Sequence, residues 1–316
     1  MPPQARELLS PSREQVGDLS EIIDRFPATS VAIRVPTTAP DAPAKPFVQW
    51  VGGKREMIPH YANFLPTDYG TYFEPFAGGA AMYFHLLPTD AVLADLNAEL
   101  VLAYIGLRDE CDEVISLLGA LKAKHSKDLY LRVRSLDREF DLEEDFTAAE
   151  IAARLIYLNQ TCFNAIYRVN RKGQFNVPIG SSLNRTILDA DALKRASVAL
   201  SKSVIIHSDF ANAVAGAASG DFVYLDPPYH PVSEHSNFTR YTKEQFPEED
   251  QLRIKLLVDD LTNRGVKVML SNSDCPFVRG LYEAYSAHEV QSGRNLNSRA
   301  ERRGKVSELV ITNFGR

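Results

Sequence analysis

The sequence predicts a doubly wound α/β fold, in which a Rossmann-like, mostly parallel sheet carries helices on both faces. Short β-rich runs recur along the chain, and most are continuously apolar, as expected for strands that are covered on both faces. Helical stretches, such as the one over 248–265, lie between several of these runs. The expected strands are TYFEPF, AVLADL, SVIIHSDF, DFVYLD, VKVMLSN and SELVITNF.

The order of these segments divides the chain into three parts. Residues 1–46 hold eight of the eighteen prolines, so we expect a Pro-rich, flexible N-terminal extension with one short helix in LSEIIDRF. The strands and their helices fill 47–107 and 203–316, which we expect to form one domain. Residues 108–202 interrupt the alternation of strands and helices. They show helical patterns and one hairpin-like segment over 164–180, whose turn we place at Lys172 and Gly173. We interpret 108–202 as an inserted second domain.

Composition and charge narrow the classes of function. The formal net charge of −6 argues against a surface that binds polyanions all over, although it permits a local basic cleft. Cys111, Cys162 and Cys275 are too widely spaced for a disulfide framework or a zinc site, so we expect reduced thiols and no metal. No window approaches the roughly 18 to 20 apolar residues that a bilayer span needs. We therefore expect a cytoplasmic protein with no membrane partner.

A glycine turn follows the first expected strand, in FEPFAGGAA over 73–81. Gly78 and Gly79 permit close approach of the backbone to a ligand, although such a pair is often only a turn. Asp95 ends the next strand seventeen residues after Gly78, where it could accept hydrogen bonds from ribose hydroxyls or, alternatively, cap a helix. The segment lacks the G-x-G-x-x-G that cradles a pyrophosphate. A nucleoside without a pyrophosphate fits better, and S-adenosylmethionine is the commonest such cofactor.

The stretch VYLDPPYHPVS over 223–233 ends an apolar strand in Asp226, Pro227, Pro228 and Tyr229. The alternative to a site is an exposed turn. The tetrapeptide suits an exocyclic amine, because a carboxylate and the Pro227 carbonyl can both accept its N–H bonds. The prolines fix the backbone and offer no competing donor, while the tyrosine ring supplies a face on which a base can stack. We expect a catalytic site here.

These motifs together resemble one family. FVQWVGGK, FEPFAGGAA, ADLN, SDF and DFVYLDPPY stand in the order found in the Dam-type, D12 or α-group DNA adenine-N6 methyltransferases, and the likeness runs from about residue 47 to 314. It implies an S-adenosylmethionine-dependent methyltransferase sheet over 47–107 and 203–316, with a mainly helical target-recognition domain over 108–202 that carries a β-hairpin.

The resemblance also implies a cofactor site. Lys54 would lie near the cofactor's carboxylate, Asp95 at its ribose, and Asp209 with Phe210 at its adenine ring. The alternatives left open are a buried aromatic at residue 50, a solvated lysine at 54 and a plain strand end at 209–210. The implied cofactor-binding residues are Trp50, Lys54, Glu74, Phe76, Gly78, Gly79, Asp95, Asp209, Phe210 and Asp226.

Basic and aromatic residues of the hairpin indicate contacts with double-stranded DNA, although a solvated basic hairpin is the alternative. The segment resembles the recognition hairpin of the GATC-specific members, in which Phe163 would be the wedge, Arg168 would read a guanine, and Ile166 and Pro178 would meet a thymine. We also expect contacts from an N-F-T-x-Y loop over 235–246 and from a basic run over 294–305. The expected DNA-binding residues are Phe163, Asn164, Ile166, Arg168, Asn170, Arg171, Pro178, Asn237, Arg294, Arg302 and Lys305.

The resemblance therefore predicts a site-specific enzyme that methylates N6 of a flipped adenine, within GATC, as a monomer at the nucleoid. Asp226 argues against an N4-cytosine methyltransferase, which more often has serine there, and a protein glutamine methyltransferase would favour asparagine. A DNA-binding regulator that has lost catalysis is a further alternative. Whether a cognate restriction endonuclease accompanies the protein is left open.

Overall fold

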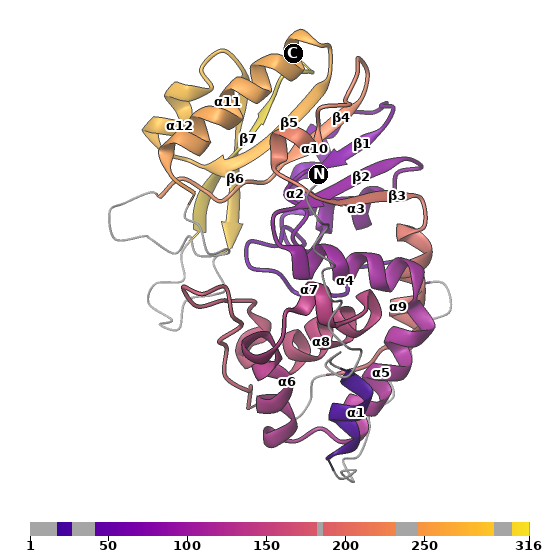
Figure 1. Cartoon of the computed structure of the whole chain (residues 1–316). Coiled ribbons are helices and arrows are strands. Elements are labelled where there is room, and N and C mark those ends of the chain that lie inside the picture. Colours follow the sequence, from indigo (N-terminus) through magenta and orange to yellow (C-terminus); the bar gives the residue numbers. More distant parts are fainter. Residues whose placement is uncertain (1–17, 27–41, 182–185, 232–245, 294–304, 316) are drawn as a thin grey trace, which may run out of the picture.

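A computed structural model describes residues 18–26, 42–181, 186–231, 246–293 and 305–315 of the chain. Figure 1 shows a sheet-bearing part above a helical part, with helix α4 between them. The strands are β1 Tyr72–Glu74, β2 Ala91–Asp95, β3 Ser203–His207, β4 Phe222–Leu225, β5 Lys267–Ser273, β6 Ser286–Gly293 and β7 Lys305–Thr312. The helices are α1 Leu19–Asp24, α2 Ile58–Tyr61, α3 Ala81–Leu86, α4 Ala98–Asp109, α5 Cys111–Ala123, α6 Lys127–Glu139, α7 Leu142–Asp145, α8 Ala148–Thr161, α9 Ala190–Leu200, α10 Phe210–Ala213, α11 Glu248–Asn263 and α12 Pro276–Leu281.

The strands form one sheet in the order β3-β2-β1-β4-β5-β7-β6. All pairings are parallel except those of β7, which runs antiparallel to both β5 and β6. All six predicted strands are confirmed. Strand β6 was not predicted, because its sequence SAHEVQSG has only isolated apolar residues and it lies at the sheet edge.

Successive residues of the inner strands point into two different apolar cores, which shows that both faces of the sheet are covered. Tyr224 and Met269 belong to the core that continues into the helical part. Val223 and Val268 belong to the core formed with α10, α11 and α12. This alternation confirms the doubly wound α/β fold, and it explains why the predicted strands read as continuous apolar runs.

The helical part packs directly on the sheet-bearing part through α4. Gly106 in α4 allows α8 to come close, because a Cβ there would lie 2.2 Å from the carbonyl oxygen of Ala148, at the start of α8. The short predicted helix at the N-terminus is α1, where Asp18 caps the first turn and Leu19 is buried. The N–H of Leu19 donates to the Glu150 carboxylate of α8, and Lys124, which directly follows α5, pairs with Asp24.

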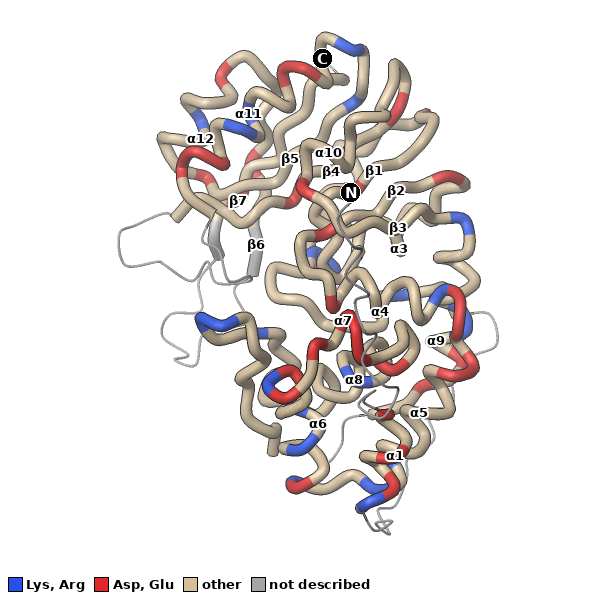
Figure 2. The backbone as a smooth tube through the Cα atoms, in the orientation of Figure 1, with Lys and Arg blue, Asp and Glu red and all other residues tan. Residues whose placement is uncertain are grey.

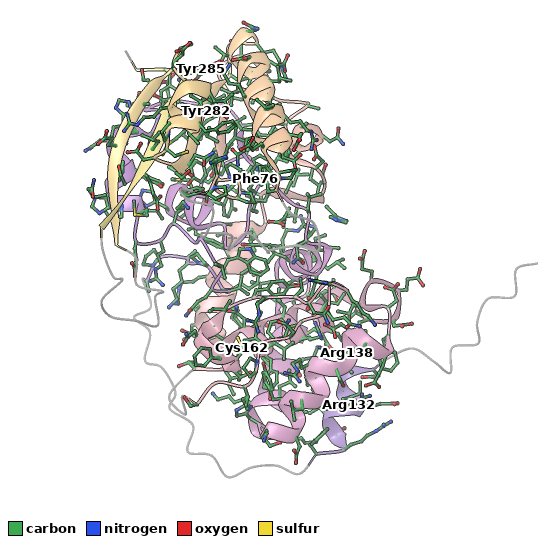
Figure 3. All side chains as sticks on the ribbon, turned by 90° about the vertical axis from the view of Figure 1, so that its left-hand side faces the viewer. Phe76, Arg132, Arg138, Cys162, Tyr282 and Tyr285 are labelled. Atoms are coloured by element: carbon green, nitrogen blue, oxygen red, sulfur yellow. The ribbon has the colours of Figure 1, made fainter. Side chains whose placement is uncertain are left out.

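The predicted domain boundaries stay predictions. The one after 107 lies near the end of α4, and the one after 202 lies at the start of β3. Figure 3 places Phe76 in the sheet-bearing part and Cys162, Arg132 and Arg138 in the helical part.

The hairpin-like segment forms two antiparallel bridges, between Cys162 and Ile179 and between Val169 and Phe175. Its turn closes where the N–H of Gly173 donates to the carbonyl of Asn170, and Gly173 has a φ of 81°. Both observations agree with the turn predicted at Lys172 and Gly173. In the described ranges, no helix is long and apolar enough to cross a membrane, and no three His, Cys, Asp or Glu side chains are grouped to hold a metal.

Candidate active site

The sheet brings the two central motifs together. Strands β1 and β4 are neighbours, and the chain order reverses between them, so their carboxyl ends border the crevice where open α/β sheets bind ligands. The glycine turn follows β1 and Asp226 follows β4. Two motifs about 150 residues apart in the sequence therefore meet at one sheet edge, as Figure 1 allows the reader to follow.

Asp226 is held by two donors inside the protein. Its side chain is 19% exposed, Oδ1 lies 3.0 Å from the ammonium nitrogen of Lys54, and the hydroxyl of Ser271 donates to Oδ1 at 2.7 Å. Burial raises the pKa of Asp226, whereas Lys54 and Ser271 oppose that rise. The site thus contains a partly dehydrated carboxyl group whose charge depends on Lys54.

Neighbouring elements fix the backbone around Asp226. Gln251 of α11 donates to the carbonyl of Pro228 at 2.9 Å, and Asn272 of β5 donates to Gln251 at 2.9 Å. Oδ1 of Asn272 also accepts the N–H of His230 at 3.1 Å. Gln251 and Asn272 are buried polar residues, and Pro227 is buried as well. The segment is therefore a supported loop, and the exposed-turn alternative is wrong.

Tyr229 is oriented by a carboxylate that the sequence analysis missed. Its hydroxyl donates to Oε2 of Glu308 at 2.9 Å, and the same oxygen accepts the hydroxyl of Tyr61 at 3.1 Å. The ammonium group of Lys54 lies 4.4 Å from the centre of the Tyr229 ring. Glu308 could not be assigned from spacing, because β7 pairs with β5 from the far end of the sequence.

The glycine turn requires glycine at residue 78. Its φ is 48°, and a Cβ there would lie 2.8 Å from Cδ1 of Trp50. The N–H of Gly78 donates to Asp95 at 2.9 Å, and the N–H of Asn97 donates to the other oxygen of Asp95 at 2.9 Å. The side chain that caps α4 is Asn97, so the alternative that Asp95 caps this helix is wrong.

Two phenylalanines stack beside this turn. The rings of Phe76 and Phe210 lie 5.3 Å apart with an angle of 25° between their planes. Asp209 caps α10 through the N–H of Ala211 and pairs with Arg253, whose guanidinium lies 4.7 Å from the centre of the Phe210 ring. Asp209 is thus more than a plain strand end. Its partner Arg253 was not predicted from the sequence.

The remaining predicted cofactor residues are largely enclosed. Trp50 is half-buried and stacks on Tyr167 of the hairpin at 4.5 Å and 21°. Lys54 is 7% exposed, so the solvated-lysine alternative is wrong. Glu74 accepts the hydroxyl of Tyr72 at 2.8 Å and the N–H of Tyr83 at 3.0 Å, and burial raises its pKa to about 8.

The predicted DNA-binding residues of the hairpin alternate with its core. Tyr167, Val169, Phe175 and Val177 are buried, and Ile166 is half-buried. Asn170 is half-buried, and its side-chain oxygen accepts the N–H groups of Lys172 and Gln174 within the turn. Figure 2 shows basic residues at the hairpin tip, on the same side as the ends of β6 and β7 in this view. The exposed members of the predicted set are Phe163, Asn164, Arg168, Arg171 and Pro178.

The structure describes no side chain for four of the predicted DNA-binding residues. Asn237, Arg294 and Arg302 lie outside the described residues, and Lys305 begins β7 without a described side chain.

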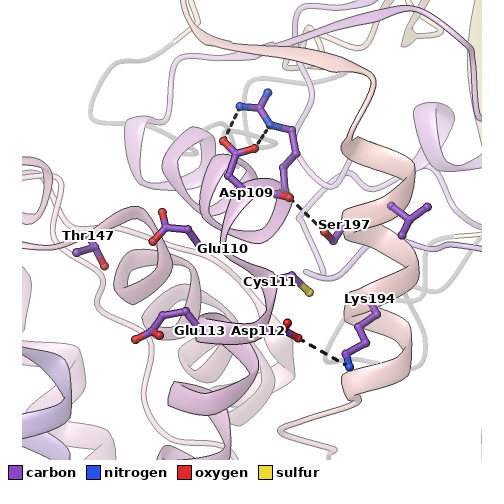
Figure 4. A pocket seen from close by; sticks show the side chains of 10 residues that line it. Asp109, Glu110, Cys111, Asp112, Glu113, Thr147, Lys194 and Ser197 are labelled. Carbon is purple, nitrogen blue, oxygen red and sulfur yellow. Dashed lines mark hydrogen bonds and ion pairs between the residues drawn. The ribbon is translucent and has the colours of Figure 1, made fainter.

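A separate hollow lies at α4, α5 and α9 (Figure 4), and none of the predicted site residues lines it. Its wall holds a weak ion pair between Lys194 and Asp112 at 3.8 Å, and Ser197 donates to the carbonyl of Arg108. Its lining gathers acidic side chains around Cys111, which burial makes a weaker acid by raising its pKa. Nothing in this lining matches the chemistry at the sheet edge.

Comparisons with known proteins agree with this geometry. The sequence model of the D12 class N6 adenine-specific DNA methyltransferases matches residues 50–296. A type II methyltransferase from Lactococcus lactis subsp. cremoris is 41% identical over 273 residues, which cover 86% of this chain and 96% of the relative. A type II methyltransferase from Methanocaldococcus jannaschii is 35% identical over 289 residues, covering 85% and 99%. The DNA adenine methylase of Escherichia coli K12 is 29% identical over 266 residues, covering 84% and 93%.

Proposed function

Since the chain belongs to the D12 class of N6 adenine-specific DNA methyltransferases, we propose that it transfers a methyl group from S-adenosylmethionine to N6 of a flipped-out adenine in duplex DNA. One observation carries the proposal. The half-buried carboxylate of Asp226 lies at the end of β4 beside Lys54 and the Tyr229 ring, at the point where the strand order reverses. Each of these groups has a task in the reaction.

The Asp226 carboxylate and the Pro227 carbonyl accept hydrogen bonds from the two N–H groups of the exocyclic amine. The nitrogen of such an amine is a poor nucleophile, because its lone pair is delocalised into the ring. Acceptors on both hydrogens favour the pyramidal geometry in which the lone pair can attack. Asp226 need not be a strong base, since the proton can leave after the nitrogen has become cationic. Orientation and electrostatics contribute most of the rate.

Tyr229 supplies the surface on which the target base stacks, and its hydroxyl bond to Glu308 anchors the far end of the ring. Gln251 and Asn272 keep the Pro228 carbonyl in place, so the backbone of the loop cannot rotate freely. A base that enters therefore meets acceptors and a stacking face that are already positioned.

The residues at the glycine turn fit S-adenosylmethionine. Gly78 lets Trp50 pack against the turn, Asp95 offers a carboxylate to ribose hydroxyls, and the Phe76 and Phe210 rings offer apolar surface to an adenine ring. When bound, the cofactor supplies an electrophilic methyl group on a positively charged sulfur. The part of the chain that faces it contributes only binding and orientation.

We assign the recognition of the duplex to the exposed face of the hairpin. Phe163 is 51% exposed and is proposed as the wedge that fills the gap left by the flipped base. Arg168 is proposed to read a guanine, and the predicted site is GATC. A cognate restriction endonuclease, a monomeric state and a place at the nucleoid in the cytoplasm stay parts of the proposal.

Two alternatives are tested by the same experiment. The protein is incubated with S-adenosylmethionine and unmethylated plasmid, and the methylated nucleoside is identified by mass spectrometry after hydrolysis of the DNA. We expect N6-methyladenine. N4-methylcytosine would instead support a cytosine enzyme, and cofactor binding without any methylated nucleoside would support a regulator without catalysis.

The variant Asp226→Ala tests the role of the loop. We expect methyl transfer to be abolished while DNA binding is retained. Asp112→Ala is the matched control, because Asp112 is a surface aspartate whose side chain is 93% exposed. Near-normal turnover of Asp226→Ala would contradict the mechanism.

A further inference from the structure

Asn159 of α8 joins two segments that are distant in the sequence. It is fully buried, and its Oδ1 accepts the N–H of Gln49 at 2.8 Å. Its Nδ2 donates to the carbonyl of Gln49 at 2.8 Å and to the carbonyl of Ala165 at 3.2 Å. One amide group thus satisfies both backbone groups of the residue before Trp50 and one carbonyl in the turn after α8.

The turn over Phe163–Ala165 has an unfavourable backbone. Asn164 and Ala165 both lie in the left-handed region, with φ of 56° and 52°, where a Cβ is close to the following carbonyl. Such conformations persist only where surrounding contacts hold them. The same conformation leaves Phe163 half exposed at the protein surface, next to a buried Ala165.

The segment at Gln49 is fixed at its other end to the cofactor site. Trp50 stacks on Tyr167 of the hairpin and touches the position where Gly78 would carry a Cβ. Asn159 therefore stands between the turn that presents Phe163 and the segment that lines the glycine turn. If the Asn159 amide lost its hydrogen bonds, the Phe163 turn and the Gln49 segment could shift relative to each other.

We propose that Asn159 is a positioning residue. It sets the Phe163 turn relative to the segment that runs from Gln49 to Lys54, the residue in contact with Asp226 and Tyr229, so that the wedge and the target-base site keep a fixed relative position. This inference rests on the proposed function, because it requires base flipping. A merely structural role would predict lower stability of the fold and nothing specific to flipping.

The test uses Asn159→Asp, which has the same shape. Oδ1 can still accept from Gln49, but the donor is replaced by an oxygen that faces the carbonyls of Gln49 and Ala165. Thr161→Val is the matched control, since Thr161 is also buried in α8 but its hydroxyl donates within the helix, to the carbonyl of Tyr157 at 2.6 Å. Flipping is measured with a duplex that carries 2-aminopurine at the target adenine, whose fluorescence rises when the base leaves the stack.

For Asn159→Asp we expect the fluorescence rise at saturating protein to fall about five-fold or more, with kcat falling in parallel. The Kd for the duplex should change by less than about three-fold, because the exposed contacts of the hairpin remain. Thr161→Val should flip the base like the wild type. A rise within about two-fold of wild type in folded Asn159→Asp, or an equal loss in Thr161→Val, would overturn the inference.

Two further measurements separate the possible failures. Absence of any fluorescence rise in the wild type would contradict base flipping itself, and with it the proposed function. Folding is followed by the fluorescence of Trp50, the single tryptophan of the chain. If Asn159→Asp is unfolded at the assay temperature, Asn159→Ser replaces it, since a serine is too short to reach both segments, and the same loss is required.

Ala165→Gly provides a rescue. Glycine adopts the left-handed conformation without strain, so the turn depends less on the hydrogen bond from the Asn159 side chain. Adding Ala165→Gly to Asn159→Asp should restore part of the fluorescence rise. No recovery, with a normal Ala165→Gly single variant, would contradict the role of Asn159 in holding this turn.

Discussion

The ammonium nitrogen of Lys54 lies 3.0 Å from Oδ1 of Asp226 and 4.4 Å from the centre of the Tyr229 ring. One cation thus touches both the carboxylate that is proposed to accept the target N–H and the ring on which the base is proposed to stack. Burial raises the pKa of Asp226, and Lys54 opposes that rise. Lys54 therefore helps to keep Asp226 ionised, which is the state that accepts hydrogen bonds.

The first prediction concerns the pH dependence of Lys54→Met. We expect activity to be lost as pH falls through the pKa of Asp226, because protonation turns one acceptor oxygen of the carboxylate into a hydroxyl donor. Removal of Lys54 raises that pKa further, so the acid limb of the profile should move to higher pH. Single-turnover methylation measured across pH, with saturating cofactor and DNA, reports the shift.

Two variants serve as comparisons. Ser271→Ala removes a weaker stabiliser of the Asp226 carboxylate and should move the acid limb in the same direction by less. Arg55→Met removes a neighbouring exposed charge and should leave it unchanged. An acid limb that stays in place in Lys54→Met would show that Asp226 does not limit the rate at low pH.

The second prediction concerns Glu74, whose pKa is raised to about 8 by burial. In the unfolded chain this carboxyl ionises near its ordinary value of about 4.3. Between these two values the native state holds a proton that the unfolded state has released, so its contribution to stability is complete at low pH and is lost as pH rises to about 8. Ionising the buried Glu74 carboxyl destabilises the native state as pH rises. The neutral variant Glu74→Gln has no such charge to bury, and its side-chain oxygen can still accept the hydroxyl of Tyr72.

The difference in free energy of unfolding between Glu74→Gln and the wild type should therefore change in favour of the variant as pH rises from about 5 to about 9. Urea unfolding at several pH values measures it. A difference that stays constant over this range would mean that Glu74 is ionised in the native protein at neutral pH.

The third prediction concerns the buried arginine of the helical part. Arg154 is 1% exposed, pairs with Glu99 of α4 and lies 3.0 Å from Asp137 of α6. Asp137 in turn accepts the N–H of Phe175 in the hairpin at 2.7 Å. Removal of the cation leaves two carboxylates without their shared partner, so Arg154→Met should lower the free energy of unfolding by about 3–5 kcal/mol.

Arg132→Met is the control for that variant. Arg132 lies on α6, the helix that carries Asp137, and pairs with Glu139, but both side chains are partly exposed, at 27% and 46%. Its loss should cost less than about 1 kcal/mol, because exposed pairs are screened by water. Urea unfolding with unchanged slopes measures both, and equal effects would contradict the importance of burial for Arg154.

Much of the sheet and its motifs could be predicted, because those signals are local in the sequence. Continuous apolar runs mark strands covered on both faces, whereas edge strand β6 carries no such run. Asp226 is recognisable from its own neighbours. Its partner Ser271 and the Tyr229 partner Glu308 lie 45 and 79 residues away, on strands whose positions only the sheet order reveals.

The same limit applies to the side chains that support the site. Gln251 falls on the buried face of an ordinary amphipathic helix, and nothing in its sequence context distinguishes it from a polar surface residue. Lys54 could be assigned to the site from its motif, but its pairing with Asp226 depends on the approach of a loop to the end of β4. Sequence patterns thus indicate which residues carry chemistry, while tertiary structure decides which of them touch.

The last prediction concerns base discrimination by Arg168. Its side chain is exposed, and Nε donates to Oδ1 of Asn176 at 2.8 Å across the hairpin. If Arg168 reads a guanine, Arg168→Ala should relax discrimination at one base pair by about 1–3 kcal/mol and leave the other positions unchanged. Arg171→Ala, at the exposed tip, should instead weaken binding to all sequences alike and reduce the salt dependence. Methylation rates on GATC and on its single-base variants, measured at several salt concentrations, separate these outcomes.

A uniform loss for Arg168→Ala would identify Arg168 as a phosphate contact. Another residue of the hairpin would then have to read that base pair.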